Sequence, residues 1–429
     1  MLIKNSNIET LPLAPDNTHY DEISELLLAG DWNGIGNWTG GYIDDTKRMD
    51  GHSGFMLTTT GSSVTLEYTF AESLDLSILS NYELLIWIDN PLQISNTSLR
   101  VTFHKTSGEY ANINLRPRFN LGGANEGYYR VRFPRSGFSY QSGFTDTDWA
   151  SVDKVSFSIN CDAGDTVQCA LITLRRVKQK GIVTINFDDW SPSVYNIAFP
   201  IMRKYNVQGA FYVMTSEIGK TDRVTSAQLQ KLYNNGWDIG NHTHTHPDLT
   251  TLTENEVRAE LATARQILLD LGFYRSCNLL ATPSGTWSSD LLYIFKDFIN
   301  FARFNAGWNA MVPLPAKWGE FPIAGYVSIL NTDTVETTKT QIDKAKQEGL
   351  WYNPTWHYMN GSESSLDYDA IRFEEIIQYL AQLRDAGQVD IKTPSEVLMQ
   401  IKNQDIYSES AHNVFAVRNK QIVKYPIQK

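Results

Sequence analysis

From residue 181 onward the chain alternates short apolar runs with longer segments of helical periodicity. Repeated strand-then-helix units predict a parallel sheet covered by helices, because parallel neighbours need a crossover connection. The carboxyl ends of such strands meet at one edge, where functional side chains gather. This alternation constrains the fold of residues 181–402 more than any other feature of the sequence.

The elements expected in this half follow from spacing and capping residues. Thr253 is expected to cap the longest helix at its N-terminus. Residues 403–429 show no clear period and are expected to form one more strand or an ordered tail. The expected strands are 182–187, 209–214, 238–242, 278–282, 326–330 and 351–357, and the expected helices are 193–205, 226–234, 254–271, 289–301, 335–348 and 371–386.

The first part of the chain has a different pattern. A short helix is expected at 20–28, where Ile23, Leu26 and Leu27 recur at helical spacing. Beyond it, many short alternating runs with turn residues between them indicate an antiparallel β-sandwich. These expected strands are 63–70, 82–88, 98–104, 128–133, 152–159 and 167–177.

A basic connector at 175–181 separates the two patterns. The expected division is therefore a β-sandwich at 1–178, an α/β barrel at 179–402 and a C-terminal extension at 403–429. The sandwich is similar to a jelly-roll carbohydrate-binding module, because aromatic faces stack on sugar rings. The alternative is a structural sandwich whose aromatic residues form its core. The aromatic residues concerned are Trp32, Trp38, Tyr42, Tyr110, Tyr128, Tyr129, Phe138, Tyr140 and Trp149.

Two groups of polar residues follow two of the expected strands in the second half. Asp188 and Asp189 come after the strand at 182–187, and His242, His244 and His246 follow the strand at 238–242. Two imidazoles at i and i+4 with a carboxylate from a neighbouring strand end suit Zn²⁺ or a similar divalent ion, with a fourth position left for water. Each group alone also has a non-catalytic explanation. The two aspartates could belong to a solvated turn, and the histidine run could bind metal incidentally.

Composition excludes some functional classes. A net charge of −11 argues against a protein that tracks nucleic-acid phosphates. No apolar run reaches the roughly 18 residues of a membrane span. Three cysteines are too few for a disulfide framework, and buried free thiols are expected rather than a bridge between Cys161 and Cys169.

The ordered motifs of the second half resemble the polysaccharide deacetylases, carbohydrate esterase family four. They are Phe187-Asp188-Asp189, His242-Thr243-x-x-His246-Pro247, Pro283-x-Gly285 and the late His357. The resemblance covers residues 181–401 and implies an irregular seven-stranded (β/α) barrel. It also implies a metal-dependent hydrolase that removes N- or O-linked acetyl groups from a polysaccharide.

The resemblance also implies a role for each site residue. Asp189, His242 and His246 would hold one divalent ion, with Zn²⁺ expected first and Co²⁺, Ni²⁺ or Mn²⁺ as alternatives. Asp188 would be the general base, and His357 would protonate the leaving group. The oxyanion would lie on the metal and on a backbone N–H of the segment from Pro283 to Gly285, which was therefore expected to contact substrate.

Three departures from the family pattern affect the substrate side of the site. Ala281 stands where the family often has an arginine that orients the base. Arg303 could supply a guanidinium instead and is also expected among the substrate contacts. Trp190 replaces a usual glycine and is expected to take a different turn or to wall the cleft. Trp356, like Tyr358 beside His357, is expected to wall a sugar pocket. No segment is identified that would tune His357.

The leading hypothesis is a deacetylase acting on an acetylated polysaccharide held by the first domain. The rival is an inactive carbohydrate-binding or adhesion protein on the same scaffold, supported by Ala281 and Trp190. The first residues lack a signal-peptide pattern. Extracellular action is still expected, by a removed leader, another secretion route or carriage on a phage particle. A monomer is expected for a free enzyme and a trimer for a tail-borne one.

Overall fold

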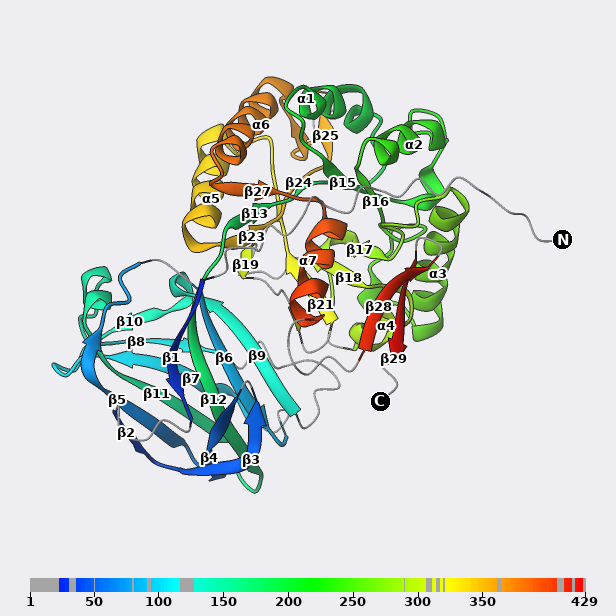
Figure 1. The fold of residues 1–429 in the computed structure, drawn as a ribbon. Coiled ribbons are helices and arrows are strands. Elements are labelled where there is room, and N and C mark those ends of the chain that lie inside the picture. Colours follow the sequence, from blue (N-terminus) through cyan, green and yellow to red (C-terminus); the bar gives the residue numbers. More distant parts are fainter. Residues whose placement is uncertain are drawn as a thin grey trace.

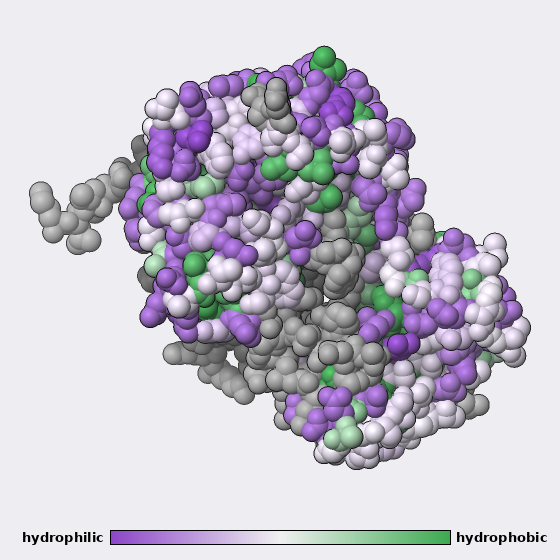
Figure 2. Space-filling view, turned by 180° about the vertical axis from the view of Figure 1, so that it is seen from behind, coloured by the Kyte–Doolittle hydropathy of each residue, from purple (hydrophilic) through white to green (hydrophobic). Residues whose placement is uncertain are grey.

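The computed structural model describes most of the chain. The described residues are 23–30, 36–49, 51–78, 81–90, 94–115, 127–288, 290–305, 311–313, 317–318, 321–360, 364–406, 413–418 and 421–426. They form a β-rich unit followed by an α/β unit, which lie side by side (Figure 1). Figure 2 shows a mostly hydrophilic face on which hydrophobic residues occur in small, separate groups.

The β-rich unit contains two antiparallel sheets, which supports the prediction of an all-β first domain. One sheet has the order β3-β4-β12-β6-β9, with β1 also pairing with β12, and the other has the order β10-β8-β7-β11-β5-β2. The strands are β1 (Ile23–Ala29), β2 (Gly36–Thr39), β3 (Tyr42–Met49), β4 (His52–Thr60), β5 (Val64–Leu74), β6 (Asn81–Ile88), β7 (Ile94–His104), β8 (Tyr110–Asn114), β9 (Gly127–Pro134), β10 (Ser139–Gln141), β11 (Val152–Cys161) and β12 (Thr166–Lys178).

A shared aromatic core joins the two sheets. Tyr82 of β6 and Phe103 of β7 come from different sheets, and their ring centroids lie 5.2 Å apart. Phe138 and Trp149 pack into the same cluster with almost no exposed surface. Several aromatic residues expected to meet sugar therefore belong to the core. Of the described ones, Tyr42 and Tyr140 are exposed, whereas Trp32 lies outside the described residues.

The helix predicted at 20–28 is wrong where the structure describes it, because residues 23–29 form strand β1. β1 pairs antiparallel with β12, and a bulge interrupts the register between Leu26 and Leu28. The extra residue lets the consecutive Leu27 and Leu28 both enter the core. Pairing with β12 satisfies the backbone of this segment, so tertiary contact overrides a short helical pattern.

The α/β unit alternates strands and helices as predicted. The helices are α1 (Phe199–Lys204), α2 (Ser226–Asn234), α3 (Glu254–Asp270), α4 (Leu291–Phe298), α5 (Val335–Glu348), α6 (Ala370–Asp385) and α7 (Pro394–Ile406). The strands are β13 (Gly181–Val183), β14 (Ile185–Phe187), β15 (Gly209–Val213), β16 (Asp238–Asn241), β17 (Leu279–Ala281), β18 (Phe301–Phe304), β19 (Met311–Pro313), β20 (Lys317–Trp318), β21 (Phe321–Gly325), β22 (Val327–Ser328), β23 (Leu350–Tyr352), β24 (Pro354–Trp356), β25 (Tyr358–Met359), β26 (Asp367–Tyr368) and β27 (Val389–Ile391).

The main sheet of this unit nearly closes on itself. Its order is β20-β21-β18-β17-β16-β15-β14-β24-β22. β21 pairs in parallel with β18 at one end, and β22 pairs in parallel with β24 at the other. Since Tyr326 alone separates β21 from β22, the two ends of the sheet are consecutive in the chain. The parallel strands therefore form a nearly closed barrel, with helices α1 to α6 around it (Figure 1).

The two units meet at the end of the barrel where its strands begin. The Gly349 carbonyl, between α5 and β23, accepts hydrogen bonds from Asn81 Nδ2 at 3.1 Å and from Gln179 Nε2 at 2.6 Å. Ser136 also donates to Glu348, and both Asn81 and Glu348 are buried. Figure 1 shows β13 starting at this junction. The β-rich unit thus packs against the amino ends of the barrel strands.

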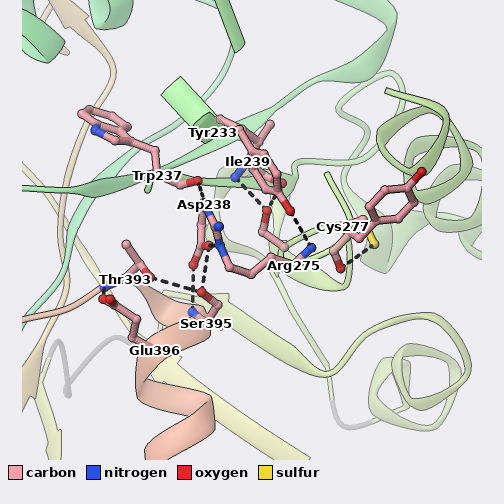
Figure 3. Close-up of polar contacts among 11 residues, drawn as sticks. Tyr233, Trp237, Asp238, Ile239, Arg275, Cys277, Thr393, Ser395 and Glu396 are labelled. Atoms are coloured by element: carbon pink, nitrogen blue, oxygen red, sulfur yellow. Dashed lines mark hydrogen bonds and ion pairs between the residues drawn. The ribbon is translucent and has the colours of Figure 1, made fainter. Parts of the chain in front are cut away.

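The last helix is tied to the same end of the barrel. Asp238, the first residue of β16, accepts hydrogen bonds from Arg275 Nε at 2.9 Å and from the backbone N–H of Ser395 at 2.8 Å (Figure 3). A carboxylate at a helix N-terminus satisfies backbone donors that have no partner in the helix. Beyond α7, strands β28 (Asn413–Arg418) and β29 (Gln421–Pro426) form an antiparallel pair, so the tail expected after 402 contains a helix end and a hairpin.

No described helix is long and apolar enough to cross a bilayer. The three cysteines are buried free thiols, as expected. Cys169 lies on β12 and Cys161 on β11, which belong to different sheets.

Candidate functional site

The predicted site residues come from the carboxyl ends of neighbouring barrel strands. Asp188 and Asp189 follow β14, His242 follows β16, and His357 follows β24. β14 pairs in parallel with β24 on one side and with β15 on the other, and β15 pairs in parallel with β16. The parallel register therefore brings segments far apart in the sequence to one edge of the barrel.

Asp189, His242 and His246 form a compact donor group. Asp189 Oδ1 lies 3.5 Å from His242 Nε2 and 3.7 Å from His246 Nε2, and the three ligand atoms all lie within 4.8 Å of one another. Tetrahedral Zn²⁺ with ligands at about 2.0–2.1 Å holds them about 3.3 Å apart. Small adjustments of the three side chains would reach that spacing, so the donor set fits a divalent ion.

The protonation of His242 suits this role. Its Nδ1 lies 2.8 Å from the Ala281 carbonyl oxygen, which can only accept a hydrogen bond. Nδ1 therefore carries a proton, and Nε2, which faces Asp189, is the nitrogen that would bind a metal ion. A backbone carbonyl in this position is a common means of fixing the tautomer and ring orientation of a metal-binding histidine.

Asp189 is an ionised carboxylate in this environment. Burial alone raises its pKa, but a hydrogen bond from His242 and the nearby imidazoles of His357 and His246 lower it to about 2. Its second oxygen, Oδ2, accepts a hydrogen bond from the Tyr358 hydroxyl at 3.1 Å. That bond leaves Oδ1 as the oxygen that faces the two histidines.

The loop that carries both histidines has an unusual backbone. Thr243 and His246 have φ values of 64° and 66°, which non-glycine residues rarely adopt. The Thr243 N–H donates to Asn241 Oδ1 at 2.7 Å, and the His246 N–H donates to Thr243 Oγ1 at 3.0 Å. These bonds fold the loop so that His242 and His246 face the same point. His244 lies outside the donor group, with Nδ1 2.9 Å from Thr215 Oγ1.

Asp188 is held by a buried arginine. Arg303 Nη2 donates to Asp188 Oδ1 at 2.5 Å, and Nη1 donates to Thr355 Oγ1 at 3.1 Å. The guanidinium also lies over the rings of Tyr212 and Tyr326, at 4.8 and 4.5 Å. Burial lowers the pKa of Arg303, but Asp188 opposes this and the net shift is upward, so the guanidinium stays protonated.

Arg303 was expected among the substrate contacts, and the structure corrects this. Its side chain is fully buried, so it acts on Asp188 and does not reach a ligand in the cleft. Arg303 lies on strand β18, and the helix predicted at 289–301 is shorter, since α4 ends at Phe298. Arg303 is the register partner of Ala281 on the adjacent strand β17. The guanidinium that contacts Asp188 therefore belongs to β18, the neighbour of the strand β17 that carries Ala281.

His357 is partly buried beside these groups. Burial lowers its pKa, and the carboxylates of Asp188 and Asp189 offset the shift in part, leaving the pKa below its usual value. Its Nδ1 has no hydrogen-bond partner among the described residues. The sequence identified no residue that tunes His357, and the described part of the structure contains none that bonds this nitrogen.

The aromatic predictions divide into two groups. Trp190 is partly exposed at the rim, with its ring centroid 6.0 Å from that of Tyr358 and the Arg223 guanidinium 4.7 Å away. Trp356 is completely buried and packs against Phe373. The expectation that Trp356 walls a sugar pocket is therefore wrong, because strand alternation turns its side chain into the core.

Pro283 and Gly285 form a tight 3-10 turn at the end of β17. Gly285 has a φ of 67°, and a Cβ there would lie 2.6 Å from Asn305 Cβ and from the Tyr326 hydroxyl, so glycine is required. Its N–H donates to the Thr282 carbonyl at 3.0 Å. That N–H is therefore not available to an oxyanion, and proline has none, which leaves Ser284 as the donor to test in this segment.

Sequence reasoning missed three contributors to the site: Arg223, Asn241 and Glu260. Glu260, on α3, accepts hydrogen bonds from the backbone N–H groups of His244 and Thr245, both at 2.8 Å. No local signal distinguishes Glu260 from other helix-surface glutamates, since its partners lie in a loop that precedes the helix.

Part of the α/β unit matches a known protein family. Residues 175–298 match the family model described as polysaccharide deacetylase. The matched range contains Asp188, Asp189, His242 and His246, and it ends before Arg303 and His357.

Known proteins similar to the chain match parts of it. Poly-beta-1,6-N-acetyl-D-glucosamine N-deacetylase of Staphylococcus aureus is 30% identical over 134 residues, covering 27% of this chain and 45% of that protein. The chain thus spans less than half of the length of the curated relatives that it matches first.

Two solved structures are also similar. The Xyl-CE4 domain of a multidomain xylanase from the hindgut metagenome of Trinervitermes trinervoides has 15% identity and a TM-score of 0.36, covering 52% of this chain and 91% of that one. The Bc1960 peptidoglycan N-acetylglucosamine deacetylase has 17% identity and a TM-score of 0.37, covering 51% of this chain and 88% of that one.

Proposed function

We propose, from the premise that the barrel of this chain is a polysaccharide deacetylase domain, that the protein is a metal-dependent hydrolase that removes acetyl groups from a polysaccharide. The observation that carries this proposal is the Asp189, His242 and His246 donor group beside the buried pair of Asp188 and Arg303. A ligand set, a carboxylate base and its orienting cation stand together at the carboxyl end of the barrel.

The residues would divide the reaction as follows. Asp189, His242 and His246 would hold a divalent ion, with Zn²⁺ proposed first, which would supply a Lewis acid for the acetyl carbonyl and for water. Asp188 takes the proton from the attacking water, and Arg303 keeps this carboxylate oriented. His357 gives a proton to the leaving nitrogen or oxygen as its bond to the acetyl carbon breaks. Acetate and a free amine or hydroxyl result.

We propose an N-acetylated glycan as the first substrate class. The relative with 30% identity is named as an N-deacetylase of poly-beta-1,6-N-acetyl-D-glucosamine. Trp190 and Tyr358 at the rim offer aromatic faces to a sugar ring.

Extracellular action remains part of this proposal, since such polymers lie outside cells. The solution mass tests the assembly, because a stable trimer favours carriage on a particle and a monomer favours a free enzyme.

The proposed division of the chain keeps the boundaries of 1–178, 179–402 and 403–429. The first part is proposed to be a jelly-roll-like sandwich that binds the polymer, supported by its two antiparallel sheets and by the exposed Tyr42 and Tyr140. The burial of Trp149 and Phe138 reduces the aromatic surface that this role can use.

The second candidate is an inactive carbohydrate-binding protein on the same scaffold. Its main support was Ala281, where the family often has arginine. Arg303 contacts Asp188 from the adjacent register position, which supplies a cation to the base by another route and favours the enzyme.

Acetate release separates the two candidates. The protein would be loaded with Zn²⁺ and assayed on N-acetylglucosamine polymers and on O-acetylated xylan, before and after treatment with a chelator. We expect about one bound ion, acetate release from the N-acetylated polymer, and loss of activity on chelation that added Zn²⁺ restores. Full activity in metal-free protein would contradict the ligand assignment. Binding of the polymer without acetate release from either substrate class would favour the inactive protein.

A further inference from the structure

A glutamate on a helix clamps the loop that carries two of the three donor residues. Glu260 lies on α3, eighteen residues of chain beyond His242, and its carboxylate points back to the loop. Oε2 accepts hydrogen bonds from the N–H groups of His244 and Thr245, both at 2.8 Å, and Oε1 accepts one from Thr245 Oγ1 at 2.7 Å. Both oxygens are therefore engaged by consecutive residues of one loop.

The two histidines are held in different ways. His242 follows directly from β16, and its ring is fixed by the Ala281 carbonyl. His246 lies at the far end of the loop, its side chain is 28% exposed, and its N–H bonds to Thr243. The position of His246 thus depends on the path of residues 243–245, and the last two of these are the ones bound by Glu260.

The loop needs such a clamp because its backbone is strained. Thr243 is β-branched and has a φ of 64°, and His246 has a φ of 66°. Residues keep such conformations when surrounding contacts determine them. The α3 carboxylate makes three hydrogen bonds here, and bonds to an ionised acceptor are stronger than neutral ones. Among the described residues, these three bonds are the polar contacts of the Glu260 carboxylate.

We propose that Glu260 is a positioning residue for the metal centre, which acts by fixing the loop that presents His246 to the ion. This inference rests on the proposed function, because it requires that the donor group of Asp189, His242 and His246 binds metal. Outer partners that orient metal ligands commonly contribute about 10- to 100-fold to metal affinity.

The test compares Zn²⁺ affinity among variants of the full chain. Glu260→Ala removes all three bonds, and Glu260→Gln keeps an amide oxygen for the two backbone N–H groups. Thr245→Val removes one bond and is the variant to use if Glu260→Ala does not fold. Glu254→Ala is the matched control, because Glu254 is on the same helix and pairs with Arg258 away from the site. Competition with a chromophoric chelator gives each dissociation constant.

We expect Glu260→Ala to weaken Zn²⁺ binding by about 10- to 100-fold, in line with outer-sphere partners elsewhere. Glu260→Gln should recover most of the affinity, Thr245→Val should show a smaller loss, and Glu254→Ala should match the wild type. The visible absorption bands of the Co²⁺-substituted protein should change in Glu260→Ala, because the ligand geometry changes. A loss of helix stability alone would not move these bands.

Two results would overturn the inference. One is a Glu260→Ala protein with wild-type Zn²⁺ affinity and an unchanged Co²⁺ spectrum. The other is a Glu254→Ala protein that loses as much affinity as Glu260→Ala, because the effect would then belong to the helix as a whole. If the wild-type protein itself binds no divalent ion, the proposed function fails first, and that outcome is distinct from either of these.

Discussion

Arg303 donates a hydrogen bond to Asp188 at 2.5 Å, although the two residues are 115 positions apart in the chain. Arg303 lies on β18, and Asp188 follows β14, with β15, β16 and β17 between them in the sheet. The arginine therefore reaches its partner across the interior of the barrel. Both side chains are almost completely buried. If one of them were removed, water could not solvate the charge of the other.

The first prediction concerns this pair. Arg303→Met should destabilise the protein by about 3–5 kcal/mol, because it leaves a buried carboxylate without its partner. The double variant Asp188→Asn with Arg303→Met should recover much of that loss, since both charges are then gone. Urea unfolding of the two single variants and the double variant measures the coupling. Additive effects of the two substitutions would contradict a direct interaction.

The second prediction separates the two neighbouring aspartates. Asp188→Asn should keep one bound Zn²⁺ and lower kcat by about 10²- to 10⁴-fold, the usual contribution of a general base. Asp189→Asn is the matched comparison and should lose metal as well, because Asp189 Oδ1 faces both histidines. Metal analysis and acetate release on the same samples provide both readings. If Asp188→Asn also loses the ion, then Asp188 is a ligand.

The third prediction follows from the position of the β-rich unit. It contacts Glu348 and Gly349 near the amino ends of the barrel strands, whereas the donor group lies at the carboxyl ends. Removal of residues 1–178 should therefore raise KM on long polymer and leave hydrolysis of a short acetylated oligomer unchanged. Steady-state kinetics on both substrates provide the measurement. Equal losses on the two substrates from a folded truncation would mean that this unit shapes the cleft.

The fourth prediction concerns pH and a histidine far from the site. Burial lowers the pKa of His104 to about 4, with a further lowering by Lys154 and a partial opposing effect of Glu67. The unfolded chain takes up this proton near pH 6.5 and the folded chain near pH 4. The contribution of neutral His104 to stability is thus present above pH 6.5 and is lost as the pH falls from 6.5 to 4.

His104→Gln should keep a polar contact with Ser156, which lies 2.7 Å from His104 Nε2. It should also make the decline of Tm between pH 6.5 and pH 4 shallower than in the wild type. Thermal unfolding across this pH range is the measurement, and parallel curves for the two proteins would show that His104 does not titrate in the window.

Much of the barrel was predictable because its signals are local. The helices predicted at 226–234 and 335–348 are confirmed to the residue, and α3 begins after its expected N-cap, Thr253, which the structure shows in a capping box with Glu256. The start of a helix, a helical period and the end of a strand can each be predicted from residues a few positions apart in the sequence. The order of parallel strands then brings Asp189, His242 and His246 to one edge, so these donors could be named before their geometry was known.

The sequence by itself therefore determined the alternation of elements, the strand ends that carry the donor residues and the family that their motifs resemble. Only the tertiary structure decided that Arg303 reaches Asp188, that Trp356 faces the core, that β1 is a strand and that Glu260 clamps the histidine loop. Each of these depends on strand register or on packing between segments distant in the chain. Periodicity and spacing record which residues share a face of one element, but not which residue of another element meets that face.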